Sequence, residues 1–192
     1  MKHWVLFILL CLTAPSSFAA NWQLDSSNSN LNFFSIKKST IGENLSFSRF
    51  EGNLNDKGEF ELSISLTSVK TGISIRDERM KKLLFDVTNF PKAIITAKVQ
   101  QSHINNLSIG MHEKLSVPMK LQLHGHVSTL TANVTVAKLS DKTFLLTSVQ
   151  PIIVNAQDFK LDAGIEKLMK IAGLPSIGEA VPVSFTLLFK KK

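Results

Sequence analysis

The chain has 192 residues, a formal net charge of +7 and a single cysteine, Cys11. Residues 1–19 combine Lys2, an apolar run too short to span a bilayer, and the small residues Ser17 and Ala19, a pattern that predicts a cleavable signal peptide and a periplasmic protein. Cleavage after Ala19 leaves 173 residues without cysteine, which excludes disulfides, thiol catalysis and cysteine metal sites.

Residues 20–192 are expected to form one domain, because they contain no internal repeat, linker or low-complexity tract. A chain of this length buries about 70% of its unfolded surface. Removal of Lys2 lowers the net charge from +7 to +6, and the charges are scattered apart from residues 190–192. This balance favours anionic surfaces, so we expect transient contact with a membrane surface, but it is too diffuse to predict nucleic-acid binding.

Alternation of polar and apolar residues, the pattern of a half-buried strand, dominates this domain. In chain order it occurs at residues 22–24, 31–33, 43–54, 59–66, 95–99, 117–123, 130–136, 144–146 and 180–189. The sequence NDKGE at 55–59 predicts a turn between two of these segments. About eight strands with one apolar face each predict an all-β protein, an antiparallel sheet closed into a barrel.

Two segments have helical spacing instead. In the first, residues 71–91, the apolar stripe consists of Met80, Leu83, Leu84 and Val87, and Asp77 is a candidate cap. In the second, residues 161–175, Asp162 is a candidate N-cap, Gly173 predicts the helix end, and the stripe consists of Ile165, Leu168, Met169 and Ala172. We expect both stripes to pack on the core, where the open mouth of the barrel is available to them.

The barrel interior is the main candidate site. Residues 20–192 contain eleven phenylalanines, one tryptophan and no tyrosine, and those expected on the inward face are Phe33, Phe47, Phe60, Phe144 and Phe185. A lining without hydroxyl groups suits a hydrocarbon ligand, whereas the same rings could instead fill the barrel as a packed core. The pattern leaves both interpretations open: a lipid-binding barrel, or a filled barrel that acts as an interaction module through its surface.

Arg76 is the most specific polar candidate. Its guanidinium could bind a phosphate with two hydrogen bonds, or it could form an internal ion pair that holds the helix down. His124 and His126 have a spacing found in zinc sites, but the intervening Gly125 predicts a turn, so we expect no metal site. No catalytic motif or phosphate-binding loop is present in the sequence, and neither an enzyme nor a cofactor is predicted.

Several segments resemble the YceI-like family, the bacterial polyisoprenoid-binding proteins. The most specific is SVKTGISIRDERMKKLLFDVTNFP at 68–91, which is similar to the family's Ser-Val-x-Thr-Gly, Arg-Asp, Leu-x-x-x-Phe and Phe/Tyr-Pro pattern. WQLDSSNSNLNF, FEGNLN, LQLHG, NAQDFKLDAG and VPVSFTLLF resemble further family elements. The sequence departs from the family at Lys160, where a glycine usually follows the Asp-Phe pair, in the changed turn at 126–129, and in the segment 165–175, which is longer than in many members.

The resemblance implies a lipocalin-like antiparallel β-barrel of about eight strands, with one or two short helices near its mouth and no enzymatic activity. It implies an isoprenoid lipid or quinone-like ligand held inside, and in many members a homodimer. With the inward face, it indicates as ligand-binding residues Phe33, Phe47, Phe60, Leu62, Arg76, Leu84, Phe85, Phe90, Phe144, Phe159 and Phe185. The helix after Arg76 is then expected to serve as a lid, with Arg76 and Lys81 near a polar headgroup.

Overall fold

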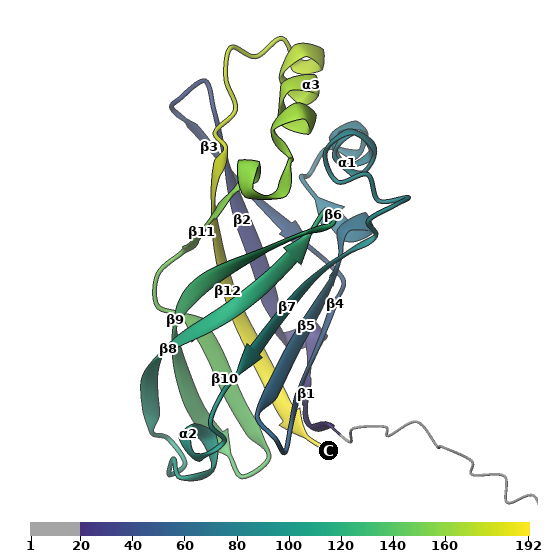
Figure 1. Ribbon diagram of the computed structural model, residues 1–192. Helices are drawn as coiled ribbons and strands as arrows, with labels where there is room; N and C mark the ends of the chain where they lie inside the picture. Colours follow the sequence, from purple (N-terminus) through teal and green to yellow (C-terminus); the bar gives the residue numbers. More distant parts are fainter. Residues whose placement is uncertain (1–19) are drawn as a thin grey trace, which may run out of the picture.

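The computed structural model describes residues 20–192, so the expected signal peptide lies outside the described residues. The described residues form one antiparallel sheet with short helices at both ends (Figure 1). Its strands are β1 (Ala20–Leu24), β2 (Asn30–Lys37), β3 (Ile41–Phe47), β4 (Phe50–Asn55), β5 (Glu59–Ser65), β6 (Val69–Lys70), β7 (Lys92–Lys98), β8 (His112–Leu123), β9 (His126–Ser140), β10 (Thr143–Ser148), β11 (Ile152–Asn155) and β12 (Ala180–Lys191).

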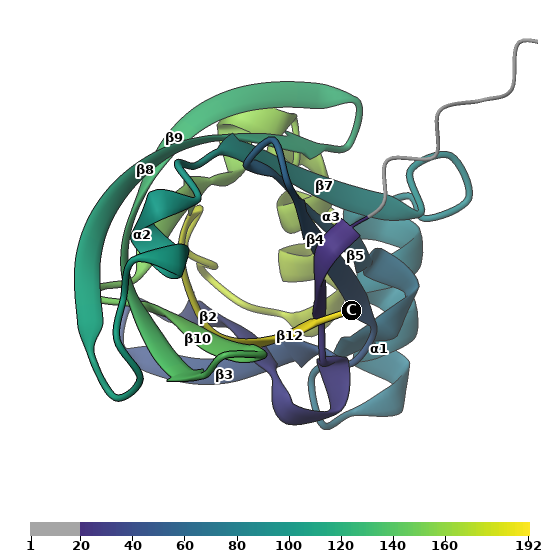
Figure 2. The ribbon, with the colours of Figure 1, turned by 90° about the horizontal axis from the view of Figure 1, so that it is seen from below.

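The sheet closes into a barrel because β12 pairs with strands on both sides. The strand order is β1-β4-β5-β7-β8-β9-β10-β12, and β1 pairs back onto β12 to complete the ring. β12 pairs with β10 and β1 along its second half and with β11 and β2 along its first half. The pairs β1/β2, β3/β4, β5/β6 and β10/β11 thus each act as one long, interrupted strand. The result is an eight-stranded antiparallel barrel, which confirms the predicted fold (Figure 2).

The interruption between β3 and β4 reverses which residues face inward, and the prediction of a single strand over 43–54 missed this. The segment 43–54, expected as one strand, is broken at Ser48 and Arg49. Leu45 is buried before the break and Phe50 after it, so the inward positions change from odd to even numbers. Backbone amides of both break residues bond to Ser68, Ser48 N–H to its carbonyl at 3.1 Å and Arg49 N–H to its hydroxyl at 3.0 Å, so the break is hydrogen-bonded.

The helical segments divide between the two ends of the barrel. At the upper end in Figure 1 lie α1 (Ser74–Arg79), the π-helical turn that follows it (Met80–Leu84) and α3 (Asp162–Ala172). At the lower end lie α2 (Ser102–Asn105), β1 and the chain's C-terminus. We call α1, the π-helical turn with Phe85, and the segment 161–172 the lid, and the opposite end the floor. Among residues 20–192, no helix is long and apolar enough to cross a membrane.

Both predicted helices exist, but their starts differ from the predictions. α1 begins at Ser74, so Asp77 lies inside the helix and does not cap it, and Ile73 occupies the N-cap position. α3 begins with Asp162 as its first residue and has Leu161 at the N-cap. The predicted end of α3 is confirmed, because Gly173 takes the left-handed conformation with φ 60°. Sequence spacing locates a helix better than it locates its first residue, because the cap depends on side chains that tertiary contacts can recruit.

Candidate functional site

A cavity of about 210 Å³ runs along the barrel from the lid to the floor. All eight long strands contribute to its wall, and Leu84, Phe85, Leu161 and Ile165 of the lid reach it from above. Among the described residues that line it, the only polar ones are Asn32, Gln100 and His103. An apolar cavity of roughly 150 Å³ accepts one benzene, and ordinary ligand pockets have about 300–1,000 Å³. A long hydrocarbon would therefore enter only if lining side chains or one end moved outward.

Most of the predicted site residues line this cavity. They are Phe33, Phe47, Phe60, Leu62, Leu84, Phe85, Phe144 and Phe185. Arg76, Phe90 and Phe159 are not part of the lining. The prediction omitted the floor helix, from which Ile104 and His103 reach the cavity, and the short strand β11, which contributes Ile152 and Val154. Neither segment is long enough for its periodicity to be recognised in the sequence.

Aromatic rings concentrate near the two ends of the cavity. Near the lid, the rings of Phe33 and Phe47 stack with centroids 5.1 Å apart, and Phe85 lies 5.9 Å from Phe47. Because Phe85 belongs to the lid and the other two to the barrel wall, this cluster connects the lid to the wall. Offset and tilted ring pairs of this kind contribute about 0.5–1.5 kcal/mol beyond their buried area.

The floor has a denser cluster. The rings of Phe144 and Phe189 stack at 4.9 Å, Trp22 meets Phe144 edge-on at 4.9 Å, and Phe60 lies 5.9 Å from Phe189. Phe189 is completely buried. These rings come from β1, β5, β10 and β12, so the floor is closed by side chains of strands that are themselves hydrogen-bonded to their neighbours.

A polar pair lies beside the floor. His103 of α2 lines the cavity, and its Nδ1 is 3.0 Å from Oε1 of Glu113 in β8. The side-chain amide of Gln101 donates to the carbonyl of Asn55, which ties α2 to the turn between β4 and β5. The floor therefore combines an apolar ring stack with a small polar margin at α2.

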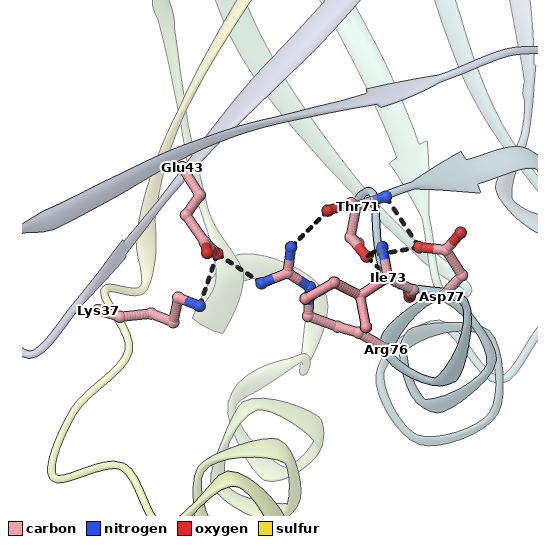
Figure 3. Close-up of polar contacts among 6 residues, drawn as sticks. All are labelled: Lys37, Glu43, Thr71, Ile73, Arg76 and Asp77. Carbon is pink, nitrogen blue, oxygen red and sulfur yellow. Dashed lines mark hydrogen bonds and ion pairs between the residues drawn. The ribbon is translucent and has the colours of Figure 1, made fainter.

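Arg76 connects the lid to the barrel wall (Figure 3). Its Nη1 donates to Oε2 of Glu43 at 2.6 Å, and its Nη2 donates to the carbonyl of Thr71. Lys37 Nζ lies 2.6 Å from the same Glu43 oxygen, so one carboxylate joins two cations. Both terminal nitrogens of Arg76 thus have internal partners, while its buried Nε has none among the described residues.

Asp77 holds the start of the lid from the other side of the same segment. Its Oδ1 accepts hydrogen bonds from the Thr71 amide at 2.8 Å and the Thr71 hydroxyl at 2.6 Å. Burial opposes ionisation of Asp77, but these hydrogen bonds outweigh it, so the pKa of Asp77 is lowered. Burial likewise opposes ionisation of Glu43, but the hydrogen bond from Lys37 and the charges of Arg76 and Lys37 lower its pKa. We call Lys37, Glu43, Thr71, Arg76 and Asp77 the latch.

The two helical parts of the lid touch at Gly164. A Cβ at this position would lie 2.7 Å from the Leu83 carbonyl oxygen and 2.8 Å from the Leu84 Cα. Such distances are shorter than real Cβ contacts, so only glycine permits this approach of α3 to the π-helical turn. The sequence shows a glycine near the start of α3, but not which backbone it must face.

Phe90 and Phe159 lie outside the cavity, and both contact His124. The Phe90 ring is 4.6 Å from the ring of His124, and His124 Nδ1 is 3.1 Å from the Phe159 carbonyl oxygen. Phe159 is completely buried. His124 and Gly125 form the turn between β8 and β9, as the glycine predicted, and they join that turn to the segment before α3.

Comparison with known proteins identifies the family. The YceI-like domain matches residues 22–189 of the chain. The chain belongs to the YceI-like family. A polyisoprenoid binding domain from Saccharophagus degradans, implicated in plant cell wall breakdown, is 33% identical, with a TM-score of 0.89, and the match covers 91% of this chain and 100% of that one.

Structures with lower sequence identity share the fold. BcnA from Burkholderia cenocepacia is 20% identical, with a TM-score of 0.66 over 86% of this chain and 98% of its own. A YceI protein from Campylobacter jejuni is 18% identical, with a TM-score of 0.56 over 100% of this chain and 99% of its own. A comparison with curated proteins gives no match. The family assignment expected from the motifs is thus confirmed.

Proposed function

We propose that this YceI-like protein binds a long-chain isoprenoid or a related lipid inside its barrel and carries or stores it in the periplasm without catalysing a reaction. The observation that carries the proposal is the apolar cavity that all eight long strands line from lid to floor. The similarity to a polyisoprenoid binding domain supports the same ligand class. Burial of hydrocarbon supplies about 25 cal/mol per Å², so a tail inside such a wall gains stability without any polar contact.

Mass spectrometry of an organic extract tests the proposal directly. Protein purified without detergent is expected to contain a lipid with a long hydrocarbon chain, and stripped protein is expected to take up an added polyprenyl compound. Absence of both would contradict the proposal and favour an interaction module that acts through its surface.

A matched pair of variants in β9 assigns the lipid to the cavity. Ala132 is buried and lines the cavity, whereas Ala137 in the same strand is not part of the lining. Ala132→Phe is expected to fill the cavity and to reduce lipid uptake at least tenfold, and Ala137→Phe is expected to leave uptake unchanged. Melting curves of both variants verify that they fold, because overpacking costs about 1–3 kcal/mol. Equal uptake by the two variants would place the lipid outside the barrel.

A further inference from the structure

Exposed isoleucines gather around the lid end of the barrel. Ile41 in β3 is 47% exposed, Ile73 and Ile75 at the start of α1 are 50% and 58% exposed, and Ile171 near the end of α3 is 49% exposed. Isoleucine is among the residue types most often buried, and single exposed ones are unremarkable. Four on segments that meet at one end of the molecule require an explanation. We call these four residues the rim patch.

The three segments that carry the rim patch are in direct contact. The ion pair between Arg76 and Glu43 joins the start of α1 to β3 at 2.6 Å. The Lys38 amide donates to the Ser176 carbonyl at 3.1 Å, which joins the β2–β3 hairpin to the connection that follows α3. The hairpin, α1 and α3 stand together at the upper end in Figure 1. The isoleucines therefore surround the end of the barrel that the lid covers.

The same segments carry most of the net positive charge of residues 20–192. Residues 36–43, 70–82 and 162–171 contain nine lysines and arginines against five acidic residues, a net charge of +4. Three of the five carboxylates are neutralised locally: Glu43 by Lys37 and Arg76, Glu78 by Lys81, and Glu166 by Lys170. Among the described residues, no ion pair involves Lys38, Lys70 or Arg79. The surface around the rim patch is thus apolar and cationic together, which is the composition of proteins that lie at an anionic lipid interface.

We propose that the lid end docks on an anionic lipid bilayer, with Ile41, Ile73, Ile75 and Ile171 entering the boundary between headgroups and acyl chains and the lysines contacting anionic headgroups. The inference rests on the proposed function, because a hydrocarbon tail that left a bilayer through water would lose its burial at every methylene. Docking by the lid end would place that end of the cavity at the lipid surface, so a tail that passed under the lid would avoid that exposure.

The floor end supplies a matched control. Ile109 and Met111 are 58% and 57% exposed, as much as Ile73 and Ile75. They belong to the connection between β8 and α2, the helix at the floor end (Figure 1). The double variants Ile73→Asp/Ile75→Asp and Ile109→Asp/Met111→Asp change the net charge equally and remove similar apolar surface. They differ in the end of the barrel that they alter.

Flotation with lipid vesicles tests the proposal. The purified protein is expected to float with vesicles that contain phosphatidylglycerol, at least tenfold more than with pure phosphatidylcholine vesicles, and high salt should weaken the association. The Ile73→Asp/Ile75→Asp variant is expected to lose this association at least tenfold, while the Ile109→Asp/Met111→Asp variant retains it. No flotation of the unaltered protein, or equal behaviour of the two variants, would overturn the proposal.

Lipid content measured on the same samples separates this inference from the proposed function. Both double variants are expected to melt as folded proteins and to keep a bound lipid, because neither pair lines the cavity. A lipid-loaded protein that never floats would overturn docking alone. A protein that floats through the rim patch but never contains a lipid would overturn the proposed function alone.

Discussion

The floor and the lid close the same barrel by different means. At the floor, rings from four strands stack over one another, and strand pairs such as Trp22 with Lys191 hold the wall behind them. At the lid, helices cross the mouth and are held by a few separate contacts: the latch, Phe85 against Phe47, and Gly164 against the π-helical turn. Moving the floor requires strand pairs to break. Moving the lid requires the contacts named above to break and its buried side chains, among them Met80 and Ile165, to leave the core, but no strand pair has to break. The lid is therefore the end that can move while the hydrogen bonds of the barrel stay intact.

The largest effect is expected at the floor. Phe189→Ala removes a completely buried ring and should lower the free energy of unfolding by about 3–5 kcal/mol. Phe34→Ala, at an exposed position of β2, is the control and should change it little. Chemical denaturation measures both. A small loss for Phe189→Ala would mean that the floor can adjust as easily as the lid.

A smaller loss is expected where the two parts of the lid meet. Gly164→Ala forces a Cβ against the backbone at Leu83 and Leu84 and should cost about 1–3 kcal/mol. Because the strain lies in the lid, hydrogen exchange should increase in residues 74–85 and 161–172 and remain slow in the floor strands. Gly42→Ala is the control, since no atom lies within 4 Å of a Cβ there. Uniform acceleration across the barrel would show that the ends do not move separately.

Substitution of Arg76 tests whether this residue is part of a structural latch or of a headgroup site. Its terminal nitrogens bond to Glu43 and Thr71, so Arg76→Ala should cost about 1–2 kcal/mol, less than a fully buried charged hydrogen bond because the side chain is partly exposed. Affinity for a charged polyprenyl lipid and for a neutral quinone should then fall alike.

The Glu43→Gln variant checks the latch assignment. Because Arg76 and Glu43 share one contact, Arg76→Ala combined with Glu43→Gln should lower the free energy of unfolding by less than the sum of the two single effects. A loss confined to the charged lipid, with an unchanged melting temperature, would instead make Arg76 a headgroup ligand.

Acid should loosen both ends through different carboxylates. The pKa values of Glu43 and Asp77 in the lid are lowered from ordinary values of 4.5 and 3.8. At the floor, the hydrogen bond from Lys190 lowers the pKa of Asp25. Since the folded-state pKa is the lower one, the stabilisation is complete above the ordinary value and disappears as the pH falls through the folded-state value.

Melting curves and hydrogen exchange measured from pH 7 down to pH 2 test this assignment. Acid is expected to increase hydrogen exchange in the lid and at the floor. Glu43→Gln and Asp77→Asn should remove the increase in the lid, and Asp25→Asn should remove the increase at the floor. Acid sensitivity that survives all three substitutions would assign it to other carboxylates.

The smallest effect is expected at Lys160, before α3. It has φ 55°, a conformation that glycine adopts without strain and other residues adopt at a cost of about 1–2 kcal/mol. Lys160→Gly should therefore stabilise the protein, by about 0.5 kcal/mol after the greater freedom of glycine in the unfolded chain is subtracted. A melting curve measures the difference. A lower melting temperature would show that the lysine side chain makes a contribution of its own at the lid.

Much of the barrel could be predicted because each strand has one buried face, and burial of one face imposes alternation on the sequence. The inward positions of Phe60 and Phe144 followed from that alternation. The break at Ser48 and Arg49 was not predicted, although these two consecutive polar residues interrupt the alternation. The hydrogen bonds from their amides to Ser68, which hold the break, join residues far apart in the sequence. The floor helix was also missed, because one turn with a single buried isoleucine has no period.

By itself, the sequence determined an eight-stranded barrel with an apolar interior, two helical segments and a family-specific Arg-Asp pair, because these depend on periodicity and on neighbouring residues. The tertiary structure alone decided that both helical segments cover one end, that Arg76 pairs with Glu43 rather than with its neighbour Asp77, and that Gly164 lies against Leu83. It also decided that Phe90 and Phe159 lie outside the cavity. These contacts join residues far apart in the chain. Their energy depends on distances between atoms in the folded barrel, and a local sequence pattern does not contain those distances.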